Sequence, residues 1–341
     1  MLSFVNDYSE GACPEILQRL AETNLDHNPG YGSDDICASA SRRIREAFSC
    51  PEAEVFYLVG GTQTNTVVID SLLSKCEGVV SAATGHIGVH EAGAVEASGH
   101  KVLTVPSHSG KMTAADLRAY LAGFYADGNH EHMVFPGMAY ISHPTEYGTL
   151  YSKAELEALH AVCAEYNIPL YMDGARLGYA LACPENDLAP ADIARLTDVF
   201  YIGGTKCGAL FGEAVVFPRG NMPRRFVTLA KQHGALLAKG WLLGLQFDVL
   251  FTDGLYERVC KNAIDIADML REALRGKGYR FFMENPTNQL LVVLENSRMR
   301  ALSEQCAFSF WEAVDDTHTA VRFCTSWASR PEEIKALIRV L

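Results

Sequence analysis

The strongest constraint on this chain is a buried-strand segment followed by two glycines and one lysine, 198-DVFYIGGTKCGALFG-212. Residues 198–202 predict a parallel strand that is covered on both faces. Gly203 and Gly204 let the backbone turn just past its carboxyl end, where open α/β sheets place their ligands. In such a dry place the pKa of Lys206 falls from about 10.4, which favours the neutral amine that makes Schiff bases. Considered alone, Lys206 also fits a solvated surface lysine.

A second strand, residues 168–172, ends in Asp173. A carboxylate at a strand tip, one crossover from the lysine strand, can pair with a protonated ring nitrogen. Pyridoxal phosphate needs such a partner, because its pyridinium must stay protonated to withdraw electrons from the substrate. The alternative interpretation of Asp173 is a helix N-cap.

A third strand, residues 55–59, runs into Gly60 and Gly61, and Thr62 and Gln63 begin a helix. Backbone N–H groups and the positive end of the helix dipole make this junction a candidate seat for an anion. The spacing is neither G-x-G-x-x-G nor a Walker loop, so a single phosphate suits it better than a dinucleotide or a nucleoside triphosphate. A plain strand-to-helix turn is the alternative.

Composition narrows the functional classes. The formal net charge is -12, from 41 acidic and 29 basic residues, so no nucleic-acid partner is expected. No apolar run approaches the ~18 residues of a membrane helix, so no membrane association is expected. The ten cysteines are scattered without a C-x-x-C pair, which predicts reduced thiols and a cytoplasmic protein.

Strands and helices alternate along the first two thirds of the chain, which predicts an α/β domain with a mainly parallel sheet between helices. Two of the expected helices span residues 88–98 and 222–250. The remainder predicts a smaller α+β domain. The expected division is residues 1–245, an N-terminal arm with the large domain, and residues 246–341, the small domain.

The motifs Gly61-Thr62-Gln63, His86, Asp173-Gly174-Ala175-Arg176 and Lys206, in this order, resemble the fold-type I pyridoxal-phosphate enzymes. The most similar family is that of the threonine aldolases, or β-eliminating lyases. The resemblance covers nearly the whole chain and includes 6-NDYSEGACPEIL-17, 28-NPGYGSDD-35, 145-TEYGTLYS-152 and 320-AVRFCTSWA-328. It implies an aspartate aminotransferase-like fold with a seven-stranded sheet, pyridoxal 5'-phosphate as cofactor, and cleavage of a β-hydroxy-α-amino acid into glycine and an aldehyde.

The resemblance also implies residue roles. Lys206 would form the Schiff base, His86 would stack on the cofactor ring, and Asp173 would pair with the ring nitrogen. The implied cofactor-binding residues are Gly61, Thr62, Gln63, His86, Asp173, Arg176 and Lys206. The implied substrate-binding residues are Asn6, Tyr31, Arg176 and Arg322. Asn6 stands where many relatives have serine, and Tyr31 would serve the site of a neighbouring subunit in a homodimer or homotetramer with shared active sites.

The sequence leaves several alternatives open. The base at the substrate hydroxyl is His86, His143, Glu146 or water. His86, His90 and Glu91 lack the order and the third ligand of a zinc site, so no metal is expected. The same scaffold also supports β-elimination, transamination or racemisation, and a non-catalytic protein that only binds the cofactor is a further alternative.

Overall fold

The computed structural model describes residues 2–341 and is built around a seven-stranded sheet. The strands lie in the order β2 (Glu54–Leu58), β8 (Glu213–Phe217), β7 (Val199–Gly203), β6 (Leu170–Asp173), β5 (Phe135–Ser142), β3 (Glu77–Ala82) and β4 (Val102–Val105). β8 is antiparallel to both of its neighbours, and the other pairs are parallel. The predicted mainly parallel sheet is therefore confirmed, and the central strands are short and apolar because helices cover both faces.

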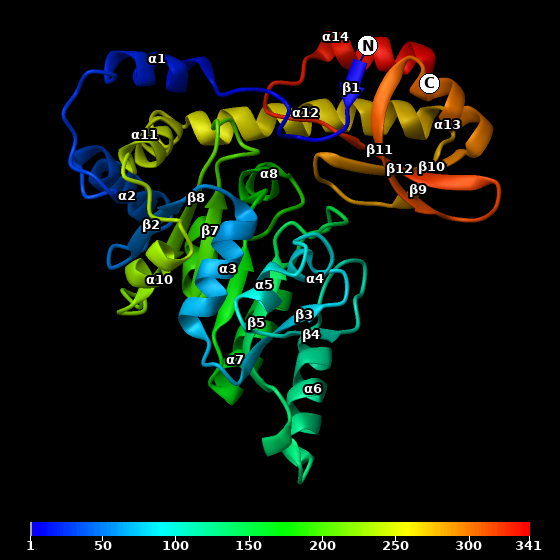
Figure 1. The fold of residues 1–341 in the computed structure, drawn as a ribbon. Coiled ribbons are helices and arrows are strands. Elements are labelled where there is room, and N and C mark those ends of the chain that lie inside the picture. The colour runs from blue at the N-terminus through cyan, green and yellow to red at the C-terminus, as the bar shows by residue number, and fades with distance from the viewer. Residues whose placement is uncertain (1) are drawn as a thin grey trace.

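Helices cover the two faces of this sheet (Figure 1). One face packs on α3 (Gly61–Leu72), α5 (Ala94–Ala97) and α10 (Phe226–Gln232). The opposite face packs on α2 (Asp35–Ala47), α6 (Ala114–Ala126), α7 (Lys153–Tyr166), α8 (Leu177–Ala182), α9 (Pro190–Leu196) and α11 (Trp241–Leu250). The remaining elements of this part are α1 (Pro14–Glu22), α4 (His86–Val89) and the short 3-10 helix η1 (His130–His132).

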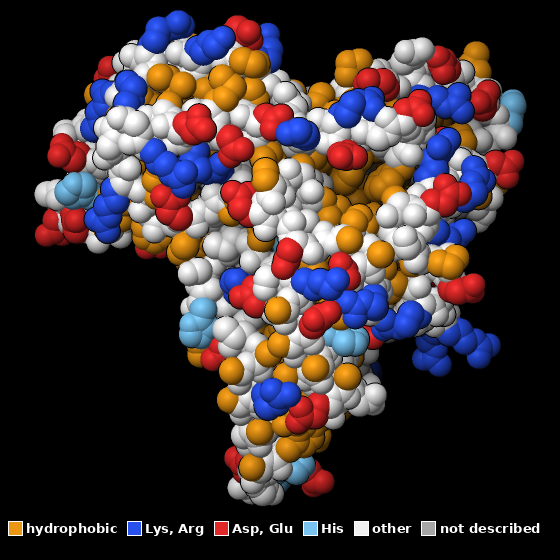
Figure 2. Space-filling view, turned by 180° about the vertical axis from the view of Figure 1, so that it is seen from behind, with side chains coloured by type: hydrophobic (Ala, Val, Ile, Leu, Met, Phe, Trp, Pro, Cys, Tyr) orange, Lys and Arg blue, Asp and Glu red, His pale blue; other side chains and the backbone are white. Residues whose placement is uncertain are grey.

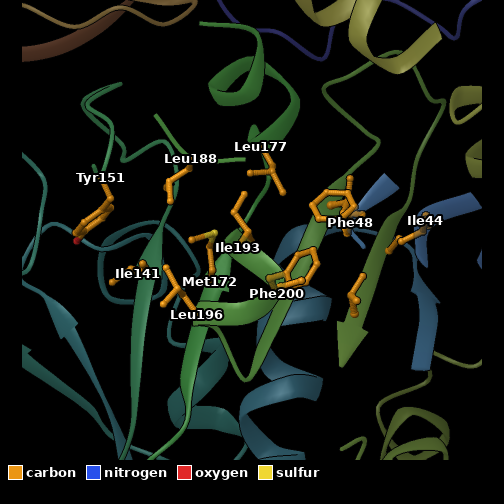
Figure 3. Close-up of a cluster of buried hydrophobic side chains, with 14 of the residues drawn as sticks. Ile44, Phe48, Ile141, Tyr151, Met172, Leu177, Leu188, Ile193, Leu196 and Phe200 are labelled. Atoms are coloured by element: carbon orange, nitrogen blue, oxygen red, sulfur yellow. The ribbon is translucent and has the colours of Figure 1, made fainter. Parts of the chain in front are cut away.

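The core on the second face shows how the strand side chains are used (Figure 3). Met172 on β6 and Phe200 on β7 are register partners, and both are fully buried against Leu177, Ile193 and Leu196. The residues next to them, such as Tyr171 and Tyr201, point to the first face. Alternation along the central strands thus sends successive apolar side chains into two cores, one on each face.

A second sheet forms the smaller unit. Its order is β1 (Leu2–Phe4), β11 (Cys306–Ala313), β12 (His318–Cys324), β10 (Gln289–Glu295) and β9 (Arg280–Met283). The helices α12 (Leu255–Gly276), α13 (Asn296–Ser303) and α14 (Pro331–Val340) accompany it, and α12 runs from the side of α11 along the top of the molecule (Figure 1). The termini lie close together on this unit.

Two features differ from the expected division at residues 245 and 246. β1 pairs with β11, so the first residues of the chain extend the small sheet instead of the large domain. α11 continues without a break across the expected boundary.

Two expected helices are also divided. The helix expected over residues 88–98 is two single turns, α4 and α5, because Ala92 and Gly93 adopt positive φ angles of 52° and 72°. The helix expected over residues 222–250 is divided into α10 and α11, with Gly234 between them at φ 67°. A residue in the left-handed region ends a right-handed helix.

None of the helices within residues 2–341 combines the length and the apolar character that a membrane span requires. All ten cysteines are unpaired, and all except Cys76 are buried. Basic and acidic side chains are interspersed over the face of the molecule in Figure 2.

Gly174, just after β6, packs against the neighbouring strand so closely that a Cβ atom would overlap the carbonyl oxygen of Tyr201. We expect Gly174→Ala to lower the free energy of unfolding by about 1–3 kcal/mol or more, because the backbone atoms it meets cannot move aside. Denaturant unfolding measures this effect. The matched control is Gly123→Ala on exposed α6, where a Cβ meets nothing within 4 Å and a small gain is expected. Equal stability of the two variants would contradict the packing argument.

Candidate active site

Asp173, the last residue of β6, is a buried carboxylate that accepts hydrogen bonds at both oxygens. Oδ1 accepts from the Tyr201 hydroxyl (2.5 Å) and the Ala175 amide (3.0 Å). Oδ2 accepts from the Tyr140 hydroxyl (2.6 Å) and from Nδ2 of Asn65 (3.0 Å). A buried charge is tolerated only with such partners. The strands β5 and β7 on either side of β6 therefore supply the groups that keep Asp173 ionised.

His86 begins α4 and lies close to Asp173. Its Nδ1 is 2.7 Å from Oε1 of Glu91, which also accepts from Nδ2 of Asn65 at 2.6 Å. Burial alone would lower the pKa of His86, but the hydrogen bond with Glu91 and the charges of Asp173 and Glu91 raise it above its ordinary value. Burial likewise would raise the pKa of Asp173, but the His86 charge and the tyrosine hydroxyls lower it. The two groups thus stabilise each other's charged forms.

His86, Glu91 and Asp173 each place one potential ligand atom within 4.8 Å of the others, a spacing that a metal ion can use. The Glu91 oxygen nearest to His86 and both oxygens of Asp173 already accept hydrogen bonds from protein groups. The arrangement is explained by this hydrogen-bond network, and the expectation of no metal stays a prediction.

Lys206 follows β7 and faces the same space as Asp173. We call this space the inner cavity; its volume is about 150 Å³, and its lining includes Gly60, Gly61, Asp173, Thr205, Lys206 and Glu213. Burial and the nearby Arg176 charge lower the pKa of Lys206, although Asp7 and Asp173 act in the opposite direction. The lowered pKa favours the nucleophilic amine. Lys206 and Asp173 therefore meet at one cavity, as their sequence motifs predicted.

A wider space, the outer cavity of about 630 Å³, continues from the inner one between the two units. His86, Glu146, Arg176 and Lys206 line both cavities. The small unit contributes Arg322. The two cavities thus form one site with a narrow inner end and a broad outer end.

Arg322 lies on β12, which is the middle strand of the small sheet, so it is not an edge-strand residue that points to solvent. Nη1 donates to Oε1 of Gln289 at 2.9 Å, and Nη2 donates to the Val5 carbonyl at 3.2 Å. Nε is buried and has no partner within the part of the chain that the structure describes. A guanidinium held in this way can bind a carboxylate that enters the outer cavity.

Arg176 has a strong partner inside the protein. Its Nε and Nη2 donate to the two oxygens of the buried Asp7 at 2.7 and 2.9 Å. Nδ2 of Asn288 also donates to Asp7, at 2.9 Å. Burial would raise the pKa of Asp7, but Arg176 lowers it to about 2. The Asp7–Arg176 pair thus joins the N-terminal segment to the loop after β6, and Arg176 still lines both cavities.

The side chains of three predicted residues do not line either of the two cavities. Asn6 uses its Oδ1 in a local turn, where it accepts from the Tyr8 amide and the Ser9 hydroxyl, each at 2.9 Å. Tyr31 is half exposed and lines a separate cavity on the α2 side. His143 is fully buried, accepts from the Tyr151 amide at 3.3 Å, and has its pKa lowered to about 4 by burial. Their proposed roles stay predictions for this single chain.

The strand-to-helix junction that was predicted as a seat for an anion lies at the start of α3. Gly60 is the N-cap, and Gly60 and Gly61 line the inner cavity. Thr62 is exposed on the first turn. Gln63 turns back, and its Oε1 accepts from the Val59 amide at 3.1 Å. Gln63 therefore stabilises the turn within this chain, and its contact with a cofactor stays a prediction.

Several site residues did not stand out in the sequence. Glu91 and Asp7 lie inside segments that the motifs covered, 84-TGHIGVHEAGA-94 and 6-NDYSEGACPEIL-17, but nothing marked them as buried. Asn65, Tyr140 and Tyr201 fit the strand and helix patterns as ordinary core positions. Their polar atoms become important only because the fold directs them to Asp173 and Glu91. The available signal was a polar or hydroxyl-bearing side chain within an otherwise apolar strand or helix segment.

The Asp7–Arg176 pair predicts a large effect on stability. Replacing Asp7 by Asn leaves the buried guanidinium without a counter-charge, which we expect to lower the free energy of unfolding by about 3–5 kcal/mol. Urea unfolding measures this loss. The matched control is Asp265→Asn, which removes the exposed pair with Lys261, whose side chains are 59% and 56% exposed. Little change is expected there, and a similarly small change for Asp7→Asn would contradict the assignment.

Known proteins similar to this chain match it over most of its length. The family model described as "Beta-eliminating lyase" matches residues 4–305. The chain is 29% identical to the low specificity L-threonine aldolase of Pseudomonas aeruginosa, over 98% of this chain and 96% of that protein. A solved structure of Leishmania major threonine aldolase superposes with a TM-score of 0.96 at 43% identity, covering 100% of this chain and 98% of that chain.

An aspartate aminotransferase from Thermus thermophilus, solved with maleate, shares the fold. It gives a TM-score of 0.71 at 16% identity and covers 100% of this chain and 92% of that chain. The aspartate aminotransferase-like fold expected from the motifs is therefore confirmed. The family match spans most of the chain, and the chain belongs to the β-eliminating lyase family.

Proposed function

We propose that this protein is a pyridoxal-phosphate-dependent lyase that cleaves a β-hydroxy-α-amino acid into glycine and an aldehyde. The observation that carries the proposal is the convergence of Lys206, Asp173, His86 and Arg322 on two connected cavities. Relatives over nearly the whole chain length are named threonine aldolases. These names and the geometry support the same chemistry.

The residues present fit pyridoxal phosphate. Asp173 offers a buried negative charge for the ring nitrogen, Lys206 offers an amine with a lowered pKa, and the start of α3 offers N–H groups to a phosphate. When bound, the cofactor accepts the electrons that a breaking bond at the substrate Cα releases. Asp173 keeps its charge in this site because Tyr140 and Tyr201 donate to it.

The substrate would be bound between the two units. Arg322 binds its carboxylate, since this guanidinium lines the outer cavity and no carboxylate of residues 2–341 forms an ion pair with it. Arg176 lines the same cavity as Arg322, although its Nε and Nη2 already donate hydrogen bonds to Asp7. The side chain of the substrate then points into the outer cavity, which Tyr147, Phe310 and Trp311 line with aromatic rings.

We assign the removal of the substrate hydroxyl proton to His86. Glu91 accepts from Nδ1–H, so Nε2 carries the lone pair of the neutral ring. Glu146 is the competing candidate, because it also lines both cavities and burial raises its pKa. Its Oε1, however, accepts from the His86 amide (2.9 Å) and the Ser142 hydroxyl (2.6 Å). Buried His143 lines neither cavity and does not fit the role.

The site also points to a shared assembly. Tyr31 lies in a cavity that contains none of Lys206, Asp173 or His86, and its ring is 4.8 Å from Nζ of Lys231. An active-site role for Tyr31 would therefore require the site of another copy, and we propose a homodimer or homotetramer with shared active sites. We also propose a cytoplasmic location, which the ten unpaired cysteines support.

The activity is tested with threonine, allo-threonine and phenylserine as substrates and with assays for glycine and the matching aldehyde. We expect both products, and expect Lys206→Ala to abolish them and the visible absorption of the bound cofactor. The control Lys261→Ala changes an exposed lysine that lines neither cavity and should leave both unchanged. Formation of a keto acid without glycine would identify another reaction of the same cofactor. Cofactor binding without any turnover would identify a non-catalytic protein.

The pH dependence tests the role of His86. The neutral ring is needed, so the rate should fall as the pH drops through the raised pKa of His86, above about 6.5. Glu91→Gln removes the hydrogen-bonded charge that raises this pKa and leaves burial, which lowers it. The acid limb of kcat should therefore move to lower pH. Loss of this limb in Glu146→Gln, with no shift in Glu91→Gln, would assign the base to Glu146.

A further inference from the structure

A second buried carboxyl group, Glu213, lies at the same sheet edge and has no role in the steps above. Glu213 begins β8, and its Cα is the register partner of Leu58 on β2 and of Gly203 on β7. Neighbouring strands are about 4.8 Å apart. Glu213 thus lies between the turn that opens α3 and the loop that carries Lys206.

The side chain of Glu213 is held in place and faces the inner cavity. Oε1 accepts from the Thr205 hydroxyl at 2.8 Å, and Oε2 accepts from the Gly204 amide at 3.2 Å. Glu213 is only 3% exposed and lines the inner cavity together with Gly60 and Gly61. A carboxyl group therefore borders the seat that the start of α3 provides for a phosphate.

This position creates an electrostatic conflict. A bound phosphate monoester carries about two negative charges near neutral pH, and an ionised carboxylate beside it in a dry site repels it strongly. Burial raises the pKa of Glu213 to about 8, although the charge of Lys206 and the Thr205 hydroxyl act to lower it. The titratable groups around the inner cavity are Lys206, Arg176, Asp173, His86, Glu146 and Tyr201. Arg176 is paired with Asp7, and Lys206 is the basic side chain whose charge acts on both Glu213 and Asp173.

We propose that Glu213 is a proton-binding residue of the phosphate seat: it is a neutral carboxylic acid in the complex with pyridoxal phosphate, and in alkaline solution, where the free protein ionises it, it takes up a proton when the cofactor binds. The proton comes from solvent and stays on the carboxyl group, so no bond of the cofactor is changed. The neutral group removes the repulsion and provides an O–H donor beside the N–H groups of α3. This inference rests on the proposed cofactor and specifies how the chain accommodates the cofactor's phosphate.

The test compares two ligands, pyridoxal phosphate and pyridoxal, which lacks the phosphate. Dissociation constants are measured from absorbance in the absence of substrate, from about pH 7 to 9.5, where the phosphate stays a dianion because its second pKa is about 6. Deprotonation of Lys206 changes the affinity for both ligands equally, so the ratio of the two dissociation constants reports only the contribution of the phosphate. Above about pH 8 we expect pyridoxal phosphate to lose up to about tenfold in affinity per pH unit relative to pyridoxal.

The variant Glu213→Gln keeps the shape and the neutral charge of the protonated group, so it should bind pyridoxal phosphate with a ratio that does not depend on pH. The exposed Glu304→Gln is the matched control and should retain the wild-type profile. Proton uptake provides a measurement that needs no variant. Calorimetry of the wild type in two buffers near pH 9 should show nearly one more proton taken up with pyridoxal phosphate than with pyridoxal.

Two results would overturn the inference. In the first, the ratio of the two dissociation constants for the wild type stays constant across this pH range, which means that Glu213 does not take up a proton when the phosphate binds. In the second, Glu213→Gln changes the dissociation constants of both ligands equally, which means that Glu213 acts through the charge of Lys206 and not through the phosphate. Neither result depends on aldolase turnover, so loss of the proposed activity and loss of this inference can be told apart. Failure to bind pyridoxal phosphate at any pH would contradict both.

Discussion

The site depends on the burial of one carboxylate, Asp173, at the end of β6. A charge in that position is destabilising unless donors surround it. The fold supplies them from three directions, with Tyr140 on β5, Tyr201 on β7 and Asn65 on α3. Asn65 and Tyr171 extend the network, because the Tyr171 hydroxyl donates to Oδ1 of Asn65 at 2.7 Å. The charge of Asp173 is therefore stabilised by the same side chains that pack together at this edge of the sheet.

The charges near Asp173 are arranged so that each keeps the state that the proposed chemistry needs. The Asp7–Arg176 pair is buried beside the site and contributes almost no net charge. Lys206 then lies near both a cation and several carboxylates, and burial decides the direction of its pKa. For His86 the direction is the opposite, because the hydrogen bond with Glu91 and the Glu91 charge raise the His86 pKa. Amine, imidazole and carboxylate thus have different environments within one cavity.

Much of the fold was predictable because it follows from local patterns. The short apolar strands, the turns after them and the order of Asp173 and Lys206 predicted a mainly parallel sheet with its site at the carboxyl edge. The helix breaks near Gly93 and Gly234 were not predicted, since a glycine inside a periodic segment does not reveal its φ angle. The pairing of Leu2–Phe4 with β11 was also missed, because a contact across about three hundred residues leaves no local signal.

The sequence by itself determined the strand-turn motifs, the lysine and the aspartate at their tips, and the family to which the chain belongs. Only the tertiary structure decided which polar side chains meet: Glu91 with His86, Asp7 with Arg176, and Glu213 with the inner cavity. It also turned the His143 side chain toward the Tyr151 amide and placed Tyr31 outside the two cavities of its own chain. The reason is physical, since propensity and periodicity act over a few residues, whereas burial and charge pairing depend on segments brought together by the whole fold.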